Sequence, residues 1–241
     1  MAGKGKRFED VGFSFPKPLI DVNGKPMIQI IVENLNFPDQ HIFIVQREHL
    51  EKYSIKEMLN LIKENSEIIS VNETTEGAAC TVLLAKELIN NDEELIIANS
   101  DQWINWNNQH FLSYLREKNA DGGIITFIST HPKWSFVKID DEGQVIELAE
   151  KKPISNIATV GIYYFKKGSD FVQAAEQMIS KNIRTNNEFY VAPVFNEMIA
   201  NGQKILTYPV AEMRGLGTPE DLKRFIDIID KKTNATESER L

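Results

Sequence analysis

The chain has 241 residues, of which 42% are hydrophobic and 26% are charged, and its formal net charge is -8. This length suffices for one large α/β domain, and the negative charge argues against nucleic acid as a partner, because that binding needs a broad basic face. A single cysteine excludes an internal disulfide, and no stretch approaches the roughly 20 apolar residues of a membrane span. We therefore expect a cytoplasmic protein that does not associate with membranes, with one domain over residues 1–232 and a polar, unstructured tail over 233–241.

The first residues combine two closely spaced glycines with basic side chains. Gly3 and Gly5 permit a tight turn whose backbone N–H groups can face an anion, and the neighbouring cations are Lys4, Lys6 and Arg7. This pattern is typical of a polyphosphate site. Taken alone, it is equally consistent with an ordinary solvated turn.

The next basic residue, Lys17, stands between two prolines. Pro16 and Pro18 restrict the backbone on both sides of it, which suits a lysine that is held in one place. Together with the glycine turn, this favours a site for the phosphates of a nucleotide.

Helices and strands alternate in the part of the chain that follows. Apolar residues at helical spacing predict helices over 27–35, 48–63 and 77–89. Short apolar runs predict strands over 41–45, 67–71 and 95–98, followed by consecutive strands over 123–130, 134–139 and 145–149. This order indicates an α/β fold with a mostly parallel sheet, whose ligands bind outside the carboxyl ends of the strands.

Asp101 follows the strand over 95–98 and is therefore expected at such a carboxyl end. A carboxylate that faces a phosphate site is well placed to hold Mg²⁺, which prefers one or two carboxylates together with substrate phosphates. The alternative is that Asp101 only caps a turn or the next helix. On spacing alone the two interpretations have equal weight.

Three motifs near the N-terminus resemble the opening signature of the sugar-phosphate nucleotidyltransferases, A-G-x-G-x-R followed by P-K-P-L and G-K-P-M. They are Ala-Gly-Lys-Gly-Lys-Arg at 2–7, Pro-Lys-Pro-Leu at 16–19 and Gly-Lys-Pro-Met at 24–27. The resemblance implies a three-layer Rossmann-like (GT-A-like) fold with a small antiparallel sheet on the acceptor side. Family members carry a short apolar strand before the glycine loop, and we expect the native start to lie upstream of Met1.

In this family the glycine loop and its arginine wrap the triphosphate of an NTP, and the lysine between prolines contacts its phosphates. The resemblance therefore implies catalytic roles for Arg7 and Lys17, and it assigns the metal-binding aspartate to Asp101. The implied nucleotide-binding residues are Ala2, Gly3, Gly5, Lys6, Glu76, Gly77 and Ala78. Without the resemblance, the segment 76–79 reads as a helix N-terminus with small residues that suit close packing.

The acceptor side is implied by two further segments. Glu-Lys-Lys-Pro at 150–153 resembles the family's E-K-P, whose lysine contacts the acceptor phosphate, and Lys152 is the match. Gly161 interrupts an apolar strand, which by itself suggests a close backbone approach. Asn187 and Glu188 correspond to the acceptor-recognising segment. The alternatives are a solvated charge run at 150–152 and a helix cap at 187–188.

The closing motif departs from the family pattern. The segment 212–221 resembles D-x-G-T-P-E, but Gly215 replaces the aspartate that serves many members as a second Mg²⁺ ligand. Asp101 is then the remaining metal candidate. Thr218 and Pro219 are expected to begin the last helix as its N-cap and first turn.

The function implied is Mg²⁺-dependent transfer of a nucleotidyl group from an NTP to a phosphorylated small molecule, with release of pyrophosphate. The segments 75–79, 129–134, 150–161 and 187–190 resemble small capsule-pathway cytidylyltransferases, which favours CTP and phosphoglutamine; a hexose 1-phosphate acceptor is the main alternative. A related glycosyltransferase and a non-catalytic ligand-binding paralogue also stay open. Small family members commonly form homo-oligomers.

Overall fold

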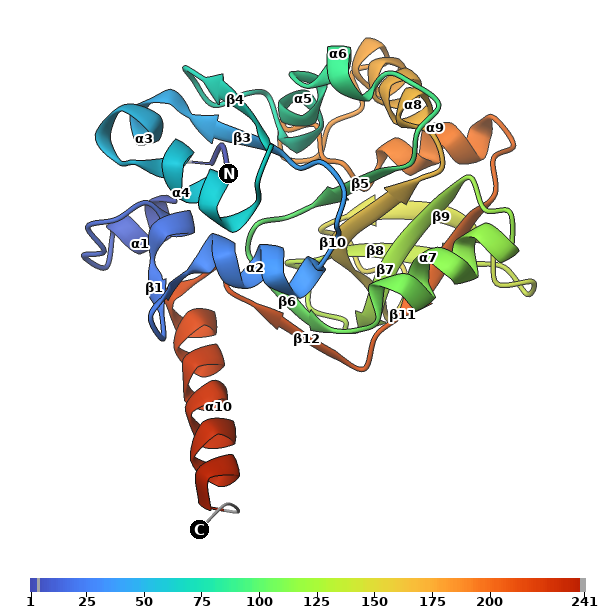
Figure 1. The fold of residues 1–241 in the computed structure, drawn as a ribbon. Helices are drawn as coiled ribbons and strands as arrows, with labels where there is room; N and C mark the ends of the chain where they lie inside the picture. The colour runs from blue at the N-terminus through green and yellow to red at the C-terminus, as the bar shows by residue number, and fades with distance from the viewer. Residues whose placement is uncertain (4, 239–241) are drawn as a thin grey trace.

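The computed structural model describes residues 1–3 and 5–238, with side chains up to Lys231; Lys4 of the glycine loop and residues 239–241 lie outside it. Figure 1 shows a sheet flanked by helices, and the last helix projects away from the rest of the molecule. The helices and the short 3₁₀ helix η1 are α1 (Lys6–Glu9), η1 (Lys17–Leu19), α2 (Met27–Leu35), α3 (Arg47–Lys52), α4 (Ile55–Ile62), α5 (Ala78–Leu83), α6 (Lys86–Ile89), α7 (Asn108–Glu117), α8 (Gly168–Ser180), α9 (Val194–Ala200) and α10 (Pro219–Ser238).

Six strands form the central sheet. Five follow the order β11 (Ile205–Pro209), β7 (Gly122–Ile128), β10 (Ile157–Phe165), β8 (Ser135–Ile139) and β9 (Val145–Glu150), and β5 (Leu95–Ala98) pairs with β10. Only β11 and β7 run parallel; the other pairs in this sheet are antiparallel. The expected α/β architecture is confirmed, but the sheet is mixed rather than mostly parallel, because β10 returns antiparallel between β5 and β7.

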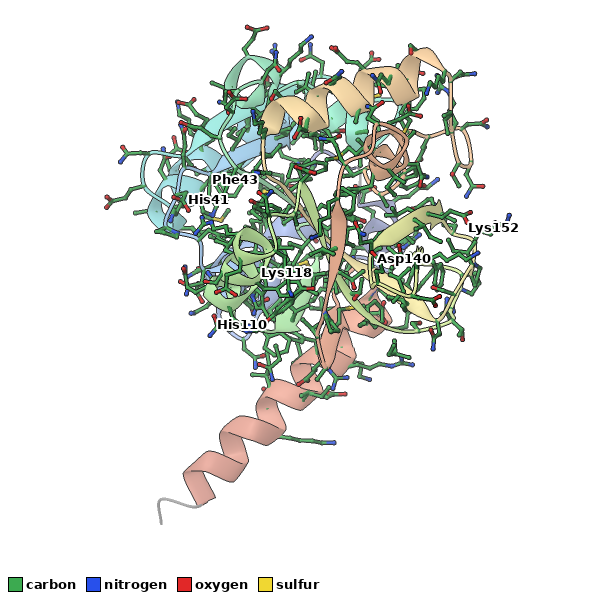
Figure 2. The ribbon with its side chains drawn as sticks, turned by 90° about the vertical axis from the view of Figure 1, so that its right-hand side faces the viewer. His41, Phe43, His110, Lys118, Asp140 and Lys152 are labelled. Carbon is green, nitrogen blue, oxygen red and sulfur yellow. The ribbon has the colours of Figure 1, made fainter. Side chains whose placement is uncertain are left out.

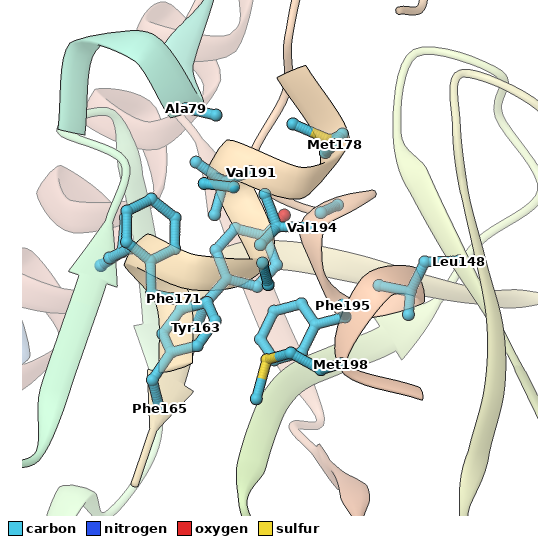
Figure 3. Packing of buried hydrophobic residues seen from close by; sticks show 14 of the residues in the cluster. Ala79, Leu148, Tyr163, Phe165, Phe171, Met178, Val191, Val194, Phe195 and Met198 are labelled. Carbon is cyan, nitrogen blue, oxygen red and sulfur yellow. The ribbon is translucent and has the colours of Figure 1, made fainter. Parts of the chain in front are cut away.

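Alternating side chains of β10 build a core on each face of the sheet. Tyr163 and Phe165 pack on one face against α8 and α9, where the Phe165 and Phe195 rings stack at 4.6 Å (Figure 3). Ile162 and Tyr164 belong to a second cluster with residues of α2, α7 and α10. Period-two alternation on a strand buried from both sides gives the three layers expected from the sequence.

Three shorter strand pairs complete the fold. They are β1 (Asp21–Val22) with β2 (Lys25–Pro26), β3 (Ile42–Gln46) with β4 (Glu67–Val71), and β6 (Gln102–Asn105) with β12 (Glu212–Gly215). β3 and β4 are parallel, and a third apolar cluster packs them against α2 and α4. Within the described residues this pair is a sheet separate from the central one. A strand before Met1 stays a prediction.

Two expected helices are interrupted. The helix over 48–63 is divided into α3 and α4 at Tyr53, whose backbone is extended (φ -132°, ψ 143°) and whose ring lies 5.8 Å from that of Phe15. The helix over 77–89 is likewise divided into α5 and α6. Both expectations were wrong at these breaks, because helical spacing of apolar residues does not report where a helix is interrupted.

The last helix begins as predicted and ends later. The Asp221 backbone N–H donates to the Thr218 hydroxyl at 3.1 Å, so Thr218 is the N-cap. α10 then continues to Ser238, so the expectation of an unstructured tail is wrong for residues 233–238. Among the described residues, none of the helices combines the length and apolar character needed to cross a membrane.

Candidate functional site

Lys17 and Asp101 form an ion pair at the carboxyl end of β5. The Lys17 Nζ lies 2.5 Å from Asp101 Oδ2, and the two side chains are only 21% and 20% exposed. Lys17 is positioned by η1, and Asp101 lies in the turn between β5 and β6. The carboxylate therefore holds one cation already and remains open to solvent at its rim.

The glycine loop packs directly against this pair. Gly5 has a left-handed backbone (φ +65°), and a Cβ added to it would lie 3.5 Å from the Lys17 Cβ. The buried Ala2 is tied to β3 because the Gln46 side-chain amide donates to its carbonyl. The loop thus approaches Lys17 with its backbone. The side chains of Lys6 and Arg7 are exposed.

The closing motif reaches the same place through the β6–β12 pair, in which Gly215 lies opposite Gln102. The Leu216 backbone N–H donates to the Asp101 carbonyl at 2.7 Å, and a Cβ on Gly217 would lie 3.0 Å from Asp101 Oδ2. Residues 215–217 therefore line one side of the Asp101 carboxylate, although nearly all of the chain separates them from the glycine loop.

A second carboxylate lies close to Gly215. A Cβ at Gly215 would lie 3.7 Å from Asp221 Oδ2 and 3.6 Å from the Trp134 ring. Asp221 is also paired with Lys133 at 3.3 Å. Asp221 lies in the first turn of α10, and the sequence motif assigns it no role in the metal site. Its nearness to Gly215 follows from the bend between β12 and α10.

These carboxylates fit a magnesium ion that is shared with a substrate. No group of three or more His, Cys, Asp or Glu side chains in the described part of the chain could hold a metal by itself. Mg²⁺ usually takes one or two carboxylates and completes its octahedron with phosphates and water. Asp101 matches the one-carboxylate form of that donor set, and Asp221 is the carboxylate nearest to Gly215.

The segment expected at the nucleobase is joined to the segment expected at the acceptor. Phe189 donates its backbone N–H to the Glu76 carbonyl at 2.8 Å and accepts from the Ala79 N–H at 2.9 Å. A Cβ on Gly77 would lie 2.3 Å from the Phe189 carbonyl oxygen, so only glycine fits there. Ala78 begins α5 directly after this contact.

Arg184 holds the nucleobase segment and the acceptor segment together, and no sequence motif pointed to it. Its guanidinium lies 2.6 Å from the Glu76 carboxylate, donates to the Asn187 carbonyl at 3.2 Å, and stacks 3.9 Å from the Phe189 ring centroid. The two predicted segments therefore form one unit. A ligand that binds the Glu76 carboxylate would therefore compete with the Arg184 guanidinium for it.

Tyr190 is the centre of a polar cluster on the acceptor side. Burial and a hydrogen bond with Glu188 raise the pKa of the Tyr190 hydroxyl. The Lys151 ammonium donates to the same hydroxyl and lies 4.5 Å from the Tyr190 ring centroid. A cation, a carboxylate and a phenol from two distant parts of the chain thus meet at one point.

The two lysines of the Glu-Lys-Lys-Pro segment point in different directions. Lys151 has a left-handed backbone (φ +54°), its N–H donates to the Trp134 carbonyl at 3.0 Å, and its side chain turns to Tyr190. Lys152 is exposed and extends from the edge of the molecule (Figure 2). The structure therefore brings Lys151, rather than the motif match Lys152, against the other acceptor-side residues.

Glu150 is a further residue of the acceptor-side cluster, and no sequence motif assigned it a role. Its carboxylate accepts a hydrogen bond from the Ser135 hydroxyl. Burial raises the pKa of Glu150, while the Ser135 hydrogen bond and the nearby Lys151 oppose the rise. The group is a half-buried carboxyl at the start of the loop that carries both lysines.

Gly161 packs against the turn that carries Asp101. Its backbone is left-handed (φ +89°), and a Cβ there would lie 2.3 Å from Asn99 Nδ2 and 2.5 Å from Gln102 Oε1. The Asn99 N–H also donates to the Gly161 carbonyl at 2.9 Å. The space that a side chain would need at Gly161 is therefore taken by two side-chain amides of the Asp101 turn.

These contacts organise the predicted residues into two groups. One contains the glycine loop, Lys17, Asp101 and Gly161; the other contains the segment 76–78, Asn187 and Glu188. Trp134 lies between them. Its ring lies near Gly215 of the closing motif, and its carbonyl accepts a hydrogen bond from the backbone N–H of Lys151, whose side chain contacts Tyr190 next to Glu188. Figure 1 shows that elements from both halves of the chain contribute.

Comparisons with known proteins identify the family of the chain. The family model described as nucleotidyl transferase matches residues 1–231. Bifunctional protein GlmU of Methanocaldococcus jannaschii is 30% identical over 169 residues, which are 69% of this chain and 38% of that protein. Mannose-1-phosphate guanylyltransferase catalytic subunit beta of Xenopus tropicalis is 27% identical over 191 residues, 76% of this chain and 53% of that one. The chain thus matches only about half or less of these relatives' length.

Solved structures show the same fold. The nucleoside-diphosphate-sugar pyrophosphorylase of Vibrio cholerae superposes with a TM-score of 0.82 at 23% identity, covering 94% of this chain and 98% of that one. A UDP-glucose pyrophosphorylase in complex with UDP-glucose gives a TM-score of 0.71 at 20% identity, covering 96% of both chains. At these identities the likeness concerns the fold alone. Because the family model spans nearly the whole sequence, the chain belongs to the nucleotidyl transferase family.

Proposed function

We propose that this protein transfers a nucleotidyl group from an NTP to the phosphate of a sugar 1-phosphate and releases pyrophosphate. The observation that carries the proposal is the Lys17–Asp101 pair, which lies under a glycine loop at the carboxyl end of β5. A cation and a carboxylate that could hold a metal, paired beside a glycine loop, suit phosphoryl chemistry. The relatives named for hexose 1-phosphates and nucleotide sugars support this acceptor class.

In the proposed reaction an oxygen of the acceptor phosphate attacks the α-phosphorus of the NTP in line, and the bond to the bridging oxygen of pyrophosphate breaks. The backbone around Gly3 and Gly5 binds the triphosphate, while Arg7 and Lys17 neutralise the charge on the departing pyrophosphate. A general base is not required, since the attacking phosphate is already ionised. The protein therefore works by positioning two anions and by neutralising their charge.

Mg²⁺, when bound, supplies positive charge shared by the reacting phosphates; Asp101 would hold it, with Asp221 as the additional carboxylate. On the acceptor side, Lys151 and Lys152 are the cations for the acceptor phosphate. Lys152 is assigned by its motif and Lys151 by its contact with Tyr190. We assign the larger part of the binding of the acceptor phosphate to Lys151, because its ammonium already lies among Glu188, Tyr190 and Glu150.

The finer assignment to CTP, phosphoglutamine and capsule synthesis rests only on the resemblance of short segments. The relatives that match the chain are GlmU proteins and sugar 1-phosphate transferases, which favour a hexose 1-phosphate instead. Homo-oligomer formation is likewise an expectation from the family. The choice of substrate is therefore left to a direct assay.

The test is pyrophosphate release with Mg²⁺ across the four common NTPs, each against glucose 1-phosphate, mannose 1-phosphate, N-acetylglucosamine 1-phosphate and phosphoglutamine. Turnover with a sugar 1-phosphate is the expected result. Turnover only with CTP and phosphoglutamine would replace the proposed acceptor. NTP binding without turnover on any pair would overturn the catalytic proposal in favour of a non-catalytic paralogue, and hydrolysis or transfer from an NDP-sugar would indicate a glycosyltransferase.

A further inference from the structure

A buried oxygen without a hydrogen-bond partner lies beside Asp101. Among the described residues, Gln102 Oε1 is one of two buried side-chain polar atoms that lack a partner, and Gln102 is only 9% exposed. Burial of an unsatisfied carbonyl costs free energy, so such atoms are rare in native proteins. The contacts within the fold therefore do not explain why this oxygen is buried.

Other buried amides of this chain are satisfied. Asn108 is equally buried, and its Nδ2 donates to the carbonyls of Leu35 and Asn36 at 3.2 and 2.6 Å. The Gln46 amide donates to the Ala2 carbonyl. The bare oxygen of Gln102 is thus a local feature of the candidate site.

The surroundings of Gln102 keep this oxygen free. Gly161 leaves room for the side chain, because Gln102 Oε1 and Asn99 Nδ2 both lie within 2.5 Å of the position that a Cβ would take on Gly161. Any other residue at 161 would push the two amides away. Asn99 and Gln102 flank Asp101 in the β5–β6 turn, and Asn99 is exposed. The result is an accessible donor and a buried acceptor next to the carboxylate.

The chemistry of an amide oxygen selects its ligand. A neutral carbonyl oxygen accepts hydrogen bonds, and ionised phosphates have no proton to donate, so among the groups of the two substrates its partner is a hydroxyl or an amine. Within the proposed function, Asp101 lies at the reacting phosphates and the nucleobase lies at the segment 76–78. The group that borders the acceptor's reacting phosphate is the sugar to which this phosphate is bonded.

We propose that Gln102 is a specificity-determining residue, whose Oε1 accepts a hydrogen bond from a hydroxyl of the sugar 1-phosphate, while the Asn99 amide donates to an oxygen of the same sugar. This inference rests on the proposed function. It explains the bare oxygen as a group that is satisfied only when the acceptor is bound. It also assigns Gly161 the task of leaving room for the two amides.

The main test compares Gln102→Met with the wild type. Methionine has a similar length but no strong acceptor, so the KM and the calorimetric Kd of glucose 1-phosphate or mannose 1-phosphate should rise about 3- to 30-fold, with the KM of the NTP unchanged. The Tm should change little, since the oxygen that is lost has no hydrogen-bond partner among the described residues. The control Asn108→Leu removes a satisfied amide and should lower the Tm without changing the acceptor KM.

A series of deoxy sugar 1-phosphates then identifies the hydroxyl. The wild type should discriminate against the analogue that lacks the contacted hydroxyl, and Gln102→Met should bind that analogue and the parent sugar about equally. If the variant discriminates as the wild type does, Gln102 does not contact the sugar. A change confined to the NTP would overturn the inference in favour of a ribose contact.

The outcomes separate this inference from the proposed function. Turnover by the wild type together with unchanged acceptor constants in Gln102→Met would sustain the function and overturn the inference. If acceptor binding weakens in Gln102→Met but neither protein shows turnover, the inference would stand and the proposed function would be overturned. If the wild type binds none of the sugar 1-phosphates by calorimetry, both are overturned.

Discussion

Lys17 and Asp101 are 84 residues apart in the chain, and their side chains meet at 2.5 Å. In the proposed reaction the lysine contacts the phosphates and the carboxylate holds the metal, so the ion pair must loosen when the nucleotide binds. The pair is part-buried, which keeps both groups in place before the substrate arrives.

Lys17→Met should lower kcat on the order of a hundredfold, because a cation that faces the departing pyrophosphate is lost. Steady-state pyrophosphate release measures this. Lys25→Met is the matched control, since Lys25 pairs with Glu33 at an exposed position. We expect that control to retain near wild-type kcat; an equal loss in both variants would contradict the assigned role of Lys17.

Removal of the carboxylates should weaken metal binding in a graded way. Mn²⁺ binding, followed by electron paramagnetic resonance with a non-hydrolysable NTP present, should weaken most in Asp101→Asn and about tenfold in Asp221→Asn. Asp230→Asn, at an exposed position on the same helix, is the control. If Asp221→Asn behaves like Asp230→Asn, Asp221 does not take part in the metal site.

Lys151→Gly should separate binding from stability. The left-handed backbone of Lys151 costs on the order of 1 kcal/mol for a residue with a Cβ, which offsets the extra entropy that glycine loses on folding. The Tm should therefore stay near that of the wild type while the acceptor KM rises. The comparison is Lys152→Gly, for which we expect the smaller change in acceptor KM; the opposite order would return the role to Lys152.

Glu150 should make stability depend on pH in a defined direction. Its folded-state pKa is raised above the ordinary value of 4.5, so its favourable contribution is present at low pH and is lost as the pH rises through the folded-state pKa. Glu150→Gln should therefore gain Tm relative to the wild type at pH 7, and the gain should shrink toward pH 4. Parallel thermal melts across this range provide the measurement, and a gain that grows toward pH 4 would refute the assignment.

Gly77→Ala should disrupt the joint between the nucleobase and acceptor segments. The new Cβ would overlap the Phe189 backbone at 2.3 Å, which cannot move without breaking its hydrogen bonds to Glu76 and Ala79. A loss of about 3 kcal/mol or more in unfolding free energy is expected. Gly143→Ala is the control, because Gly143 also has a positive φ but nothing lies within 4 Å of its Cβ position. Similar losses in both variants would show that backbone strain alone is responsible.

Local sequence patterns determined much of the secondary structure. The helix α2 and the strands β4 and β5 have the predicted bounds, and Thr218 caps α10 as predicted. These features depend on apolar periodicity and on side chains that bond to their own backbone neighbours, both of which are visible within a few residues. The family motifs add phosphate and metal roles for Lys17 and Asp101 as predictions, and in the structure the two side chains lie 2.5 Å apart.

Only the tertiary structure decided what surrounds that pair. The β6–β12 pairing brings Gly215 to the Asp101 turn, and the start of α10 brings the Asp221 carboxylate close to Gly215. The β5–β10 pairing brings Gly161 against Gln102, whose oxygen is left without a partner. Strand pairing over long separations depends on how whole faces pack, so no local pattern predicts it. The sequence alone determined which residues are the first candidates for the chemistry, and packing decided which of them lie together and which further side chains lie beside them.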